Sequence, residues 1–298
     1  MECINRARFD ADRELSPSSF ILVRLAHDCG VKISMDSSAP LLIGAPNFRD
    51  FGGYPTLDGR RVRTGRLYRT ELMLNLTPPD HETLNGLNIG LICDLRSPGE
   101  RSRVSNEWPK EGSVETLALD IDADLSSVQP DKWGKRLRDP SFTAERAREA
   151  MIDNYRQMPS AFAKDLGALF AYLEKDHARA VVIHCAVGKD RTGFVSAMVL
   201  HALGVGHEQI MANYALTSER YTPERMMSDR VRFLPNTELT PHVRTALSML
   251  VIADPVYLQA ALDAVKKDFG SLDDYLLKHC DLSPQRRDAM QSQLLVPN

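Results

Sequence analysis

The stretch HCAVGKDRTG, residues 184–193, lies between two apolar segments that predict the structure around it. The segment before it, ARAVVIH at 178–184, is rich in valine and isoleucine. The segment after it, FVSAMVLHALG at 194–204, is apolar and has no internal glycine or proline. This order predicts a buried strand, a tight turn and a helix, with the turn presented at the edge of a sheet.

A second polar segment lies upstream, in NFRDFGGYPTLDGRRVRTGRLYRTE at 47–71. Its Asp58-Gly59 pair indicates a hairpin turn. The arginines of this segment are dense and do not follow a helical period. We therefore predict an edge hairpin next to an anion, with Arg49 as a candidate contact for substrate.

Signals for a helix and two strands follow. Residues 77–87 open with Thr77 and two prolines, which predicts a capped helix. Residues 89–96 are a continuous apolar run that ends in charges, as in a buried parallel strand, and 114–119 predict a further strand. Residues 120–142 are polar and too long for an ordinary connection, so we expect a lid or a substrate-binding excursion there.

The remainder of the chain is mainly helical in pattern. Helices are expected at 143–157, 160–175, 192–203, 207–217, 222–233, 240–252, 255–267, 271–278 and 283–294. Together with the strands, they predict an α/β fold with a central, mainly parallel sheet flanked by helices and a helical C-terminal half. Residues 1–43 lack a sustained period and are predicted to form an N-terminal arm, which leaves 44–298 as one domain.

Composition and charge exclude several classes of protein. The 298 residues are 43% hydrophobic and 26% charged, which are ordinary globular values. A net charge of -3 provides no overall field for nucleic acid or for an anionic membrane. We therefore expect no nucleic-acid partner, and any anion site must be local. Nothing in the sequence indicates an oligomeric state.

The cysteines and the N-terminal segment bear on the compartment. Five cysteines are scattered without CxxC pairs, which argues against structural zinc and a disulfide framework and favours a reducing compartment. The apolar run at 20–23 is interrupted by Arg24 and is too short for a signal peptide, and no stretch approaches membrane-spanning length. We expect a cytoplasmic protein without stable membrane insertion; non-classical secretion leaves no trace in a sequence.

The loop itself is suited to hold an anion. Cys185 and Arg191 enclose five residues, and so tight a turn into a helix points successive backbone N–H groups inward. The helix dipole adds positive potential at the same place. Gly188 permits the curl, and Arg191 adds a planar fork that matches two phosphate oxygens.

Cys185, at the foot of this cradle, is the expected nucleophile. The nearby dipoles and cations favour the thiolate form of a cysteine. Thr192 can donate its hydroxyl to the sulfur and improve it as a leaving group. His184 is expected to orient the backbone of Cys185 through hydrogen bonds of its ring.

The leaving oxygen needs a proton from a positioned carboxylic acid. Asp190 lies in the loop, and Asp94 lies at the carboxyl end of a predicted strand, where open parallel sheets place their ligands. Structural pairing with Arg96 is an equal alternative for Asp94. Weaker candidates in the excursion are Asp120, Asp122 and Asp124.

Other interpretations of the loop fit less well. A Walker A loop needs glycine in place of Ile183 and serine or threonine in place of Asp190. The pair His184-Cys185 has no second pair at metal-ligand spacing. A sulfur or arsenate transferase also uses a curled cysteine loop with arginine, but Asp190 and Thr192 argue against it. A non-catalytic phosphate-binding module would ordinarily lack the nucleophile or the acid.

The loop resembles that of the cysteine-dependent protein tyrosine phosphatase superfamily, and more narrowly of its bacterial atypical branch, with its HCxxGKDRTG loop. The likeness covers roughly residues 44–298. It extends to NFRDFGGY at 47–54, GRLYRTEL at 65–72, CDLRSPGE at 93–100, NYRQMP at 154–159 and FGSLDDYL at 269–276. The family's separate WPD acid loop has no counterpart, because Trp108-Pro109 is followed by Lys110.

This resemblance implies a cysteine-dependent phosphatase fold. It also implies hydrolysis of phosphate monoesters through a phosphocysteine intermediate, without metal or another cofactor. Cys185 is then the nucleophile, Arg191 the phosphate clamp and Thr192 the partner of the thiolate. Asp190 is the favoured general acid in this branch, and Asp94 is the competing assignment.

The resemblance also implies the partners. They are phosphotyrosine proteins and, because of the Lys189-Asp190 pair, phosphoserine or phosphothreonine proteins and phosphoinositides, with inorganic phosphate as product. Lys189 would help to neutralise a second phosphate, its alternative being a solvated charge. The substrate site would also be lined by His184, Ala186, Val187 and Gly188. A helical lid is implied, and 218–233 is its natural counterpart, although ordinary helix packing fits that segment as well.

Overall fold

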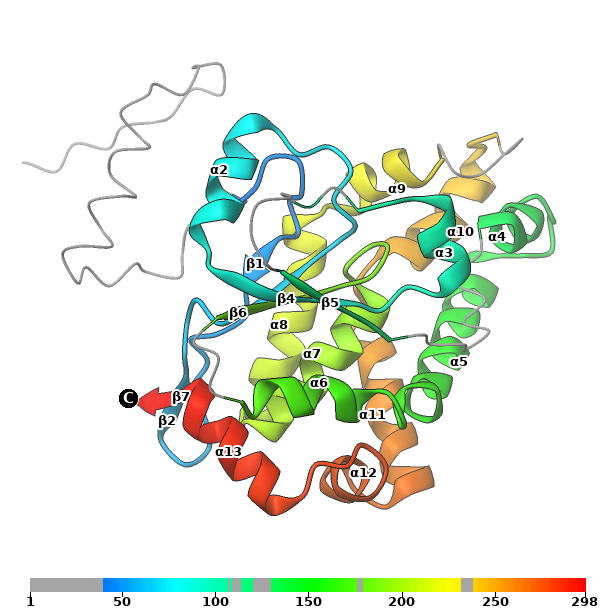
Figure 1. The fold of residues 1–298 in the computed structure, drawn as a ribbon. Coiled ribbons are helices and arrows are strands. Elements are labelled where there is room, and N and C mark those ends of the chain that lie inside the picture. Colours follow the sequence, from blue (N-terminus) through cyan, green and yellow to red (C-terminus); the bar gives the residue numbers. More distant parts are fainter. Residues whose placement is uncertain (1–39, 107, 109–113, 120–129, 176–178, 232–237) are drawn as a thin grey trace, which may run out of the picture. The chain divides into compact units, whose positions relative to one another are not determined.

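The central sheet of the computed structural model has the strand order β1-β3-β6-β4-β5 (Figure 1). Its strands are β1 (Arg49–Asp50), β3 (Leu67–Thr70), β6 (Ala180–His184), β4 (Ile89–Asp94) and β5 (Glu115–Ala118). β3, β6, β4 and β5 pair in parallel, whereas β1 pairs antiparallel with β3 at the edge. The sheet confirms the predicted α/β fold with a mainly parallel core.

The structure describes residues 40–106, 108, 114–119, 130–175, 179–231 and 238–298. The predicted arm falls mostly outside these ranges, as do Asp120, Asp122 and Asp124. Residues Pro40–Asn298 cluster as one compact unit. A small second sheet joins β2 (Arg60–Val62) to β7 (Leu295–Pro297), so the C-terminus is tied to the hairpin region.

The helices flank the sheet. Their bounds are α2 (Pro78–Gly86), α3 (Pro98–Arg103), α4 (Pro130–Leu137), α5 (Ala144–Phe162), α6 (Leu166–Leu173), α7 (Asp190–Ala202), α8 (His207–Arg220), α9 (Pro223–Val231), α10 (Pro241–Val251), α11 (Pro255–Phe269), α12 (Leu272–Lys278) and α13 (Pro284–Leu294). From α7 onward each predicted helix is confirmed to within three residues, because capping residues mark the starts. Thr240, Asp254, Ser271 and Ser283 each accept a backbone N–H of the first turn.

The prediction for residues 47–71 is correct only in part. The Asp58-Gly59 turn is present, and the Thr56 N–H donates to the Arg60 carbonyl at 2.9 Å. An edge hairpin is also present, because Pro55 and Arg61 form an antiparallel bridge and β1, at the edge of the central sheet, pairs antiparallel with β3. The pattern did not predict that β3 is itself an interior strand, which pairs in parallel with β6 on its other side. Arg69 of β3 is fully buried. The sequence pattern did not predict β3, because the groups that accept hydrogen bonds from Arg69 lie far away along the chain.

The predicted helix break near Pro159 is also wrong. α5 continues through Pro159 to Phe162. A proline inside a helix removes one N–H donor and strains the preceding turn. Here the flanking Met158 and Phe162 are fully buried, and the Tyr275 hydroxyl donates to the Pro159 carbonyl at 2.8 Å. Packing on both sides of the proline outweighs the local preference.

The excursion predicted at 120–142 contains a helix, so its interpretation as a long irregular segment needs correction. Residues 130–137 form α4, and residues 120–129 lie outside the described ranges. Trp133 and Leu137, four residues apart, are both buried in the main core. Two apolar residues at this spacing share one helix face, but the polar residues around them hid the signal.

Side chains of β6 alternate between the two faces of the sheet, as strand geometry requires. Val181 and Ile183 belong to the main core, and Ala180 and Val182 to a smaller cluster that includes Leu84 of α2. Figure 1 accordingly shows α2 on one side of the sheet and α6 and α7 on the other. The sheet is therefore covered on both faces, which explains the uninterrupted apolar sequence of this strand.

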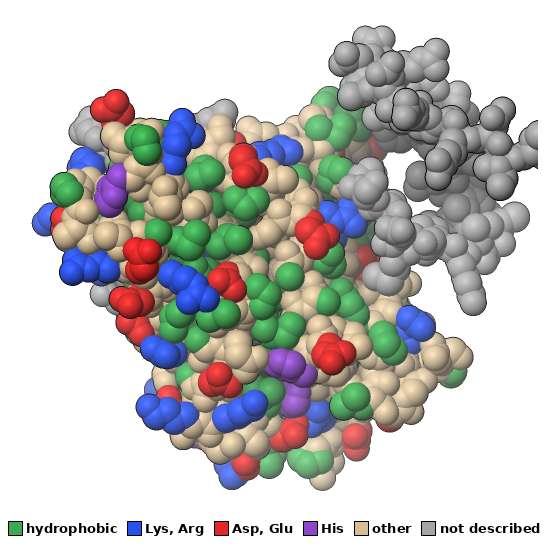
Figure 2. Space-filling view, turned by 180° about the vertical axis from the view of Figure 1, so that it is seen from behind, with side chains coloured by type: hydrophobic (Ala, Val, Ile, Leu, Met, Phe, Trp, Pro, Cys, Tyr) green, Lys and Arg blue, Asp and Glu red, His purple; other side chains and the backbone are tan. Residues whose placement is uncertain are grey.

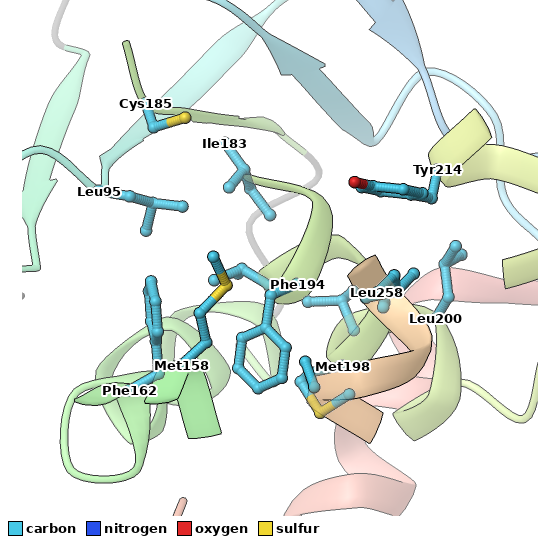
Figure 3. Close-up of a cluster of buried hydrophobic side chains, with 14 of the residues drawn as sticks. Leu95, Met158, Phe162, Ile183, Cys185, Phe194, Met198, Leu200, Tyr214 and Leu258 are labelled. Atoms are coloured by element: carbon cyan, nitrogen blue, oxygen red, sulfur yellow. The ribbon is translucent and has the colours of Figure 1, made fainter. Parts of the chain in front are cut away.

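The main core reaches the loop that follows β6. Figure 3 shows Cys185 at its margin, close to Leu95 and Ile183, with Phe194 and Met158 on the opposite side. All five residues are buried in the same cluster. The loop therefore rests on a packed floor.

The surface carries both signs of charge. On the face that Figure 2 presents, Lys and Arg side chains are interspersed with Asp and Glu. No single helix of the described residues has the length and apolar character to cross a membrane; the bent pair α10 and α11 passes that test jointly, by length and composition only.

Candidate active site

The site lies where the parallel strands end. Thr70 of β3 and Asp94 of β4 are both in register with His184, the last residue of β6. The loop of residues 185–189 follows, and α7 begins at Asp190. Three strand ends therefore surround one loop at the carboxyl edge of the sheet, which is where ligands of open parallel sheets bind.

Gly188 is the residue that allows the loop to curl. Its φ is 70°, a left-handed conformation that side chains disfavour. A Cβ at this position would also lie 2.4 Å from the Thr70 carbonyl oxygen and 2.6 Å from Nδ2 of Asn47. Only glycine fits here, because the backbone passes directly against β3.

The loop carbonyls all point outward. From residue 185 to residue 189, each peptide carbonyl is hydrogen-bonded to a group outside the loop. The His184 ring binds the Cys185 carbonyl, the Leu72 N–H binds that of Ala186, and the Asn47 side-chain amide binds that of Val187. The same amide and Arg69 bind the Gly188 carbonyl, and the Gly193 N–H binds that of Lys189. Because a trans peptide holds its C=O and N–H on opposite sides, the N–H groups of residues 186–190 point inward.

The inward N–H groups surround the Cys185 sulfur. The Gly188 N–H donates to Cys185 Sγ at 3.3 Å. Within the described ranges, the N–H groups of Ala186, Val187 and Lys189 have no acceptor. Ala186 and Val187 are half-buried, whereas Cys185 is 2% exposed. This arrangement is a cradle of peptide dipoles with a sulfur at its centre.

Arg191 is held on one side by Glu100. Its NH1 donates to Glu100 Oε2 at 2.6 Å and to the Leu95 carbonyl at 3.0 Å, and its NH2 donates to Glu100 Oε1 at 2.8 Å. A guanidinium has five N–H donors. Three are used, so the Nε–H and one N–H of NH2 stay available on the other edge, a pair matched to two oxygens of an anion.

Glu100 was missed in the sequence. It is the N3 residue of α3, where its Oε2 accepts the Ser97 N–H at 2.9 Å in a capping box. Burial acts to raise the pKa of Glu100, but the hydrogen bonds and charge of Arg191 outweigh it and the pKa is lowered. The same pairing outweighs the effect of burial on Arg191 and raises its pKa. The S-x-x-E pattern of a capping box, present as SPGE, could have predicted the place of Glu100 at the start of a helix.

Asp94 is engaged by Arg96. The Arg96 side chain donates to both of its carboxylate oxygens, with NH2 at 2.7 Å from Oδ2 and Nε at 3.0 Å from Oδ1. The Arg96 N–H donates as well, at 3.0 Å. Burial acts to raise the pKa of Asp94, but the hydrogen bonds and the charge of Arg96 outweigh it, so the pKa is lowered. The structure thus shows the pairing of Asp94 with Arg96, which was the alternative to the role of Asp94 as the general acid.

His184 faces the backbone of the nucleophile candidate. Its Nδ1 lies 3.1 Å from the Cys185 carbonyl and its Nε2 lies 3.2 Å from Nδ2 of Asn106. Burial lowers the pKa of His184, so we assign a neutral ring. Because an amide nitrogen donates to Nε2, the ring proton sits on Nδ1 and is donated to the Cys185 carbonyl. Asn106 is a second residue that the sequence did not single out.

Asp190 is bound at one oxygen. The Tyr155 hydroxyl donates to Oδ1 at 2.7 Å, and the ammonium of Lys189 lies 2.7 Å from the same oxygen. The side chain of Asp190 is 17% exposed, whereas that of Lys189 is 1% exposed. Among the predicted acids within the described ranges, Asp190 is therefore the one with access to solvent.

Lys189 is placed behind the loop. Besides Asp190, its ammonium donates to the Ile252 carbonyl at 3.2 Å and lies over the Tyr257 ring at 5.5 Å. It is therefore not the solvated charge that was one alternative. A second phosphate would have to draw this ammonium away from these three partners.

Arg49 is buried and binds protein groups, among them Asn47, whose side chain binds the loop. Its NH1 donates to Asn47, and its NH2 donates to the Asn213 carbonyl and to Thr217 Oγ1, both at 3.0 Å. Burial and the nearby Arg69 hold the pKa of Arg49 well below its usual value. The side chain of Arg49 is thus covered by protein, and its assignment as a substrate contact stays a prediction.

Two further buried groups stand near the loop. Arg69 donates to the Gly188 carbonyl at 3.0 Å and to the Asn213 side chain at 2.7 Å. Burial lowers the pKa of Arg69 to about 10. Glu71 accepts from the Thr70 hydroxyl at 2.9 Å, and burial raises the pKa of Glu71 to about 7. Their charges were visible in the sequence, but their burial was not.

The remaining predicted residues can also be located. The Thr192 hydroxyl is buried and has no hydrogen-bond partner among the described residues. Of the expected lid, Met226 of α9 is buried in the main core and Met227 packs against it, and Phe233 lies outside the described ranges. Within those ranges, no group of three or more His, Cys, Asp and Glu side chains is arranged to hold a metal ion.

Comparison with known proteins covers nearly all of the described chain. The sequence model of the family described as the tyrosine phosphatase family matches residues 41–296. The triple specificity protein phosphatase PtpB of Mycobacterium tuberculosis is 31% identical over 257 residues, which is 79% of this chain and 91% of that protein.

Two other relatives extend the comparison. A Cupriavidus necator protein, named provisionally as a tyrosine-protein phosphatase, is 30% identical over 232 residues, which is 77% of this chain and 80% of that protein. A tyrosine-protein phosphatase of Nostoc commune is 24% identical over 189 residues, which is 62% of this chain and 59% of that protein.

Proposed function

Because this chain belongs to the tyrosine phosphatase family, we propose that it hydrolyses phosphate monoesters through a phosphocysteine formed on Cys185. The protein is a protein-tyrosine phosphatase, so its substrate is phosphorylated and phosphate is its product. The covalent mechanism, the roles of individual residues and the range of substrates are the proposal.

The observation that carries the mechanism is the set of outward carbonyls of residues 185–189. It leaves five inward peptide N–H groups around one sulfur, and one of them already donates to Cys185 Sγ. Together with the free edge of Arg191, these donors suit three non-bridging phosphate oxygens held above the sulfur. Such preorganised donors stabilise charge in a transition state without reorganising.

In the first step the Cys185 thiolate attacks phosphorus. The S–P bond forms, the P–O ester bond breaks, and its electron pair stays on the leaving oxygen. Asp190 supplies a proton to that oxygen. The peptide N–H groups and Arg191 hold the remaining phosphate oxygens during the transfer.

In the second step water attacks phosphorus. The new P–O bond forms, the P–S bond breaks, and its electron pair returns to the sulfur as thiolate. The Asp190 carboxylate takes the proton of the water. The buried Thr192 hydroxyl, which lacks another partner among the described residues, is assigned to the departing sulfur.

The acid is assigned to Asp190 because a general acid must carry a proton and reach the substrate. Asp94 is 4% exposed and receives donors on both of its oxygens. A carboxylate bound in this way is stabilised in its ionised form, which is unsuited to giving a proton. Asp190 has only Oδ1 bound and its side chain is partly exposed.

We expect Asp190→Asn to slow the enzyme far more on a poor leaving group than on a good one. A general acid contributes about 10²- to 10⁴-fold when the leaving oxygen is basic, and little when it leaves unaided. The measurement is kcat/KM for phenyl phosphate and for a nitrated aryl phosphate. Asp94→Asn is the matched comparison, and its kcat/KM should fall by the same factor for both substrates. Greater leaving-group sensitivity in Asp94→Asn would reverse the assignment.

We further propose a broad substrate range: phosphotyrosine proteins first, together with phosphoserine or phosphothreonine proteins and phosphoinositides. Support comes from the name of one relative, a triple specificity phosphatase. The test is phosphate release from matched phosphotyrosine and phosphoserine peptides and from vesicles that contain a phosphoinositide. Release from the phosphotyrosine peptide alone would restrict the proposal to tyrosine.

A further inference from the structure

Two tyrosines and the loop carboxylate form a hydrogen-bonded chain. The Tyr155 hydroxyl of α5 lies 2.7 Å from Asp190 Oδ1 and 2.6 Å from the Tyr214 hydroxyl of α8. Both tyrosines are at most 1% exposed. Neither was a predicted site residue, and the mechanism above assigns them no task.

The direction of the chain follows from the number of protons. A tyrosine hydroxyl has a single hydrogen, and an ionised carboxylate can only accept. Tyr155 therefore donates its hydrogen to Asp190 and accepts one from Tyr214. Burial, and then the charge of Asp190, raise the pKa of Tyr155, and the same two causes raise the pKa of Tyr214, so both hydroxyls keep their protons.

The two oxygens of Asp190 are unequal. Oδ1 faces both the Tyr155 hydroxyl and the Lys189 ammonium, each at 2.7 Å. Oδ2 has no hydrogen-bond partner among the described residues. A proton on the carboxyl group is disfavoured at the oxygen that already faces two donors, because it would compete with both.

We propose that Tyr155, oriented by Tyr214, is a positioning residue that fixes Asp190 Oδ1 so that Oδ2 alone carries the catalytic proton. This inference rests on the proposed role of Asp190 as general acid. Donors to Oδ1 restrict rotation of the carboxyl group and leave Oδ2 as the oxygen without a partner among the described residues. The outer Tyr214 hydroxyl polarises the inner one and strengthens its bond to Asp190.

Asp190 also interacts electrostatically with other titratable groups. Those that face it or act on its charge come from four helices and the loop, and they are Tyr155, Lys189, Arg191, Tyr214 and Tyr257. The tyrosines keep their protons, because burial raises the pKa of each, and Arg191 keeps its positive charge, because its pairing with Glu100 raises its pKa. Removal of the Tyr155 hydroxyl therefore takes one hydrogen-bond donor from Asp190 and changes no charge, so its effect on a pH profile can be interpreted.

The experiment is Tyr155→Phe, which keeps the ring and its contact with Tyr257 at 5.7 Å between centroids. We expect kcat/KM for phenyl phosphate to fall about tenfold, the scale of one hydrogen bond to a charged group. The value for a nitrated aryl phosphate should change less than about threefold. The descending limb of the pH profile should move to higher pH, because the ionised carboxyl group loses a donor.

Tyr275→Phe is the matched control. The Tyr275 hydroxyl is also buried and also donates one hydrogen bond, but its acceptor is the Pro159 carbonyl of α5 and not a group of the loop. This variant should lose a similar amount of stability in thermal unfolding. Its kcat/KM for both substrates and its pH profile should keep their wild-type values. The comparison separates a lost buried hydrogen bond from a lost position of the acid.

A double variant separates the two proposals. In the Asp190→Asn background, Tyr155→Phe should add no further sensitivity to the leaving group. If Asp190→Asn alone shows no such sensitivity, the assignment of the acid is wrong. If Asp190→Asn shows it but Tyr155→Phe slows both substrates by one factor with an unmoved pH profile, then Tyr155 is merely structural and this inference is overturned.

Discussion

A Cys185→Ser variant is expected to lose phosphatase activity by about 10⁴-fold or more while it still binds inorganic phosphate or tungstate. A serine hydroxyl does not ionise near neutral pH and cannot supply the nucleophile. The outward carbonyls of the loop do not depend on the sulfur, so the inward N–H groups and Arg191 should keep their places. Activity and anion affinity are therefore predicted to separate.

The measurement combines turnover of an aryl phosphate with calorimetric titration by tungstate. Cys280→Ser serves as the control, since Cys280 is buried near Tyr275 and far along the chain from the loop. It should keep both activity and affinity. Substantial turnover by Cys185→Ser would remove Cys185 as the nucleophile. Loss of tungstate binding would mean that the sulfur, and not the peptide groups, organises the cradle.

The second large effect is expected for Arg191→Lys, which should lower kcat by about 10²- to 10³-fold with an increase in KM. An ammonium is a point charge with three donors and lacks the planar fork of a guanidinium. It cannot contact Glu100, the Leu95 carbonyl and two phosphate oxygens together, whereas Arg191 contacts the first two and is proposed to bind the phosphate oxygens with its free edge.

Glu100→Gln isolates the other side of this clamp. The amide keeps the shape of Glu100 but loses its charge and offers one acceptor oxygen to Arg191. We expect a loss of about tenfold, because the guanidinium is less firmly fixed. Steady-state kinetics of both variants, with circular dichroism to verify folding, provide the test. Wild-type kcat in Arg191→Lys would show that charge alone suffices and that the fork geometry is irrelevant.

The fold was predictable where capping residues and apolar periods agree. Thr240, Asp254, Ser271 and Ser283 precede their helices directly, and each of those helices was found. Two of the failures share one physical cause, which is tertiary contact. β3 and the helix through Pro159 depend on partners more than a hundred residues away, such as Val181 for β3 and Tyr275 for Pro159.

The candidate site was predictable in its inner part only. Cys185, Gly188 and Arg191 lie within one short stretch, and their spacing carries the geometry. Glu100 and Asn47 come from other elements, and their approach to the loop depends on the sheet register. Asp94 illustrates the limit: the sequence placed it correctly at the strand end and left its pairing with Arg96 and its role as the acid as equal alternatives, and the contacts in three dimensions show the pairing.

A cradle made of peptide groups has an evolutionary consequence. The side chains of Ala186 and Val187 are not needed for the N–H groups that point inward, and both are half-buried at the site. These two positions can therefore vary among descendants of this enzyme and reshape what fits above the phosphate without weakening the phosphate's own binding. Gly188 has no such freedom, because β3 fills the space that any side chain would take.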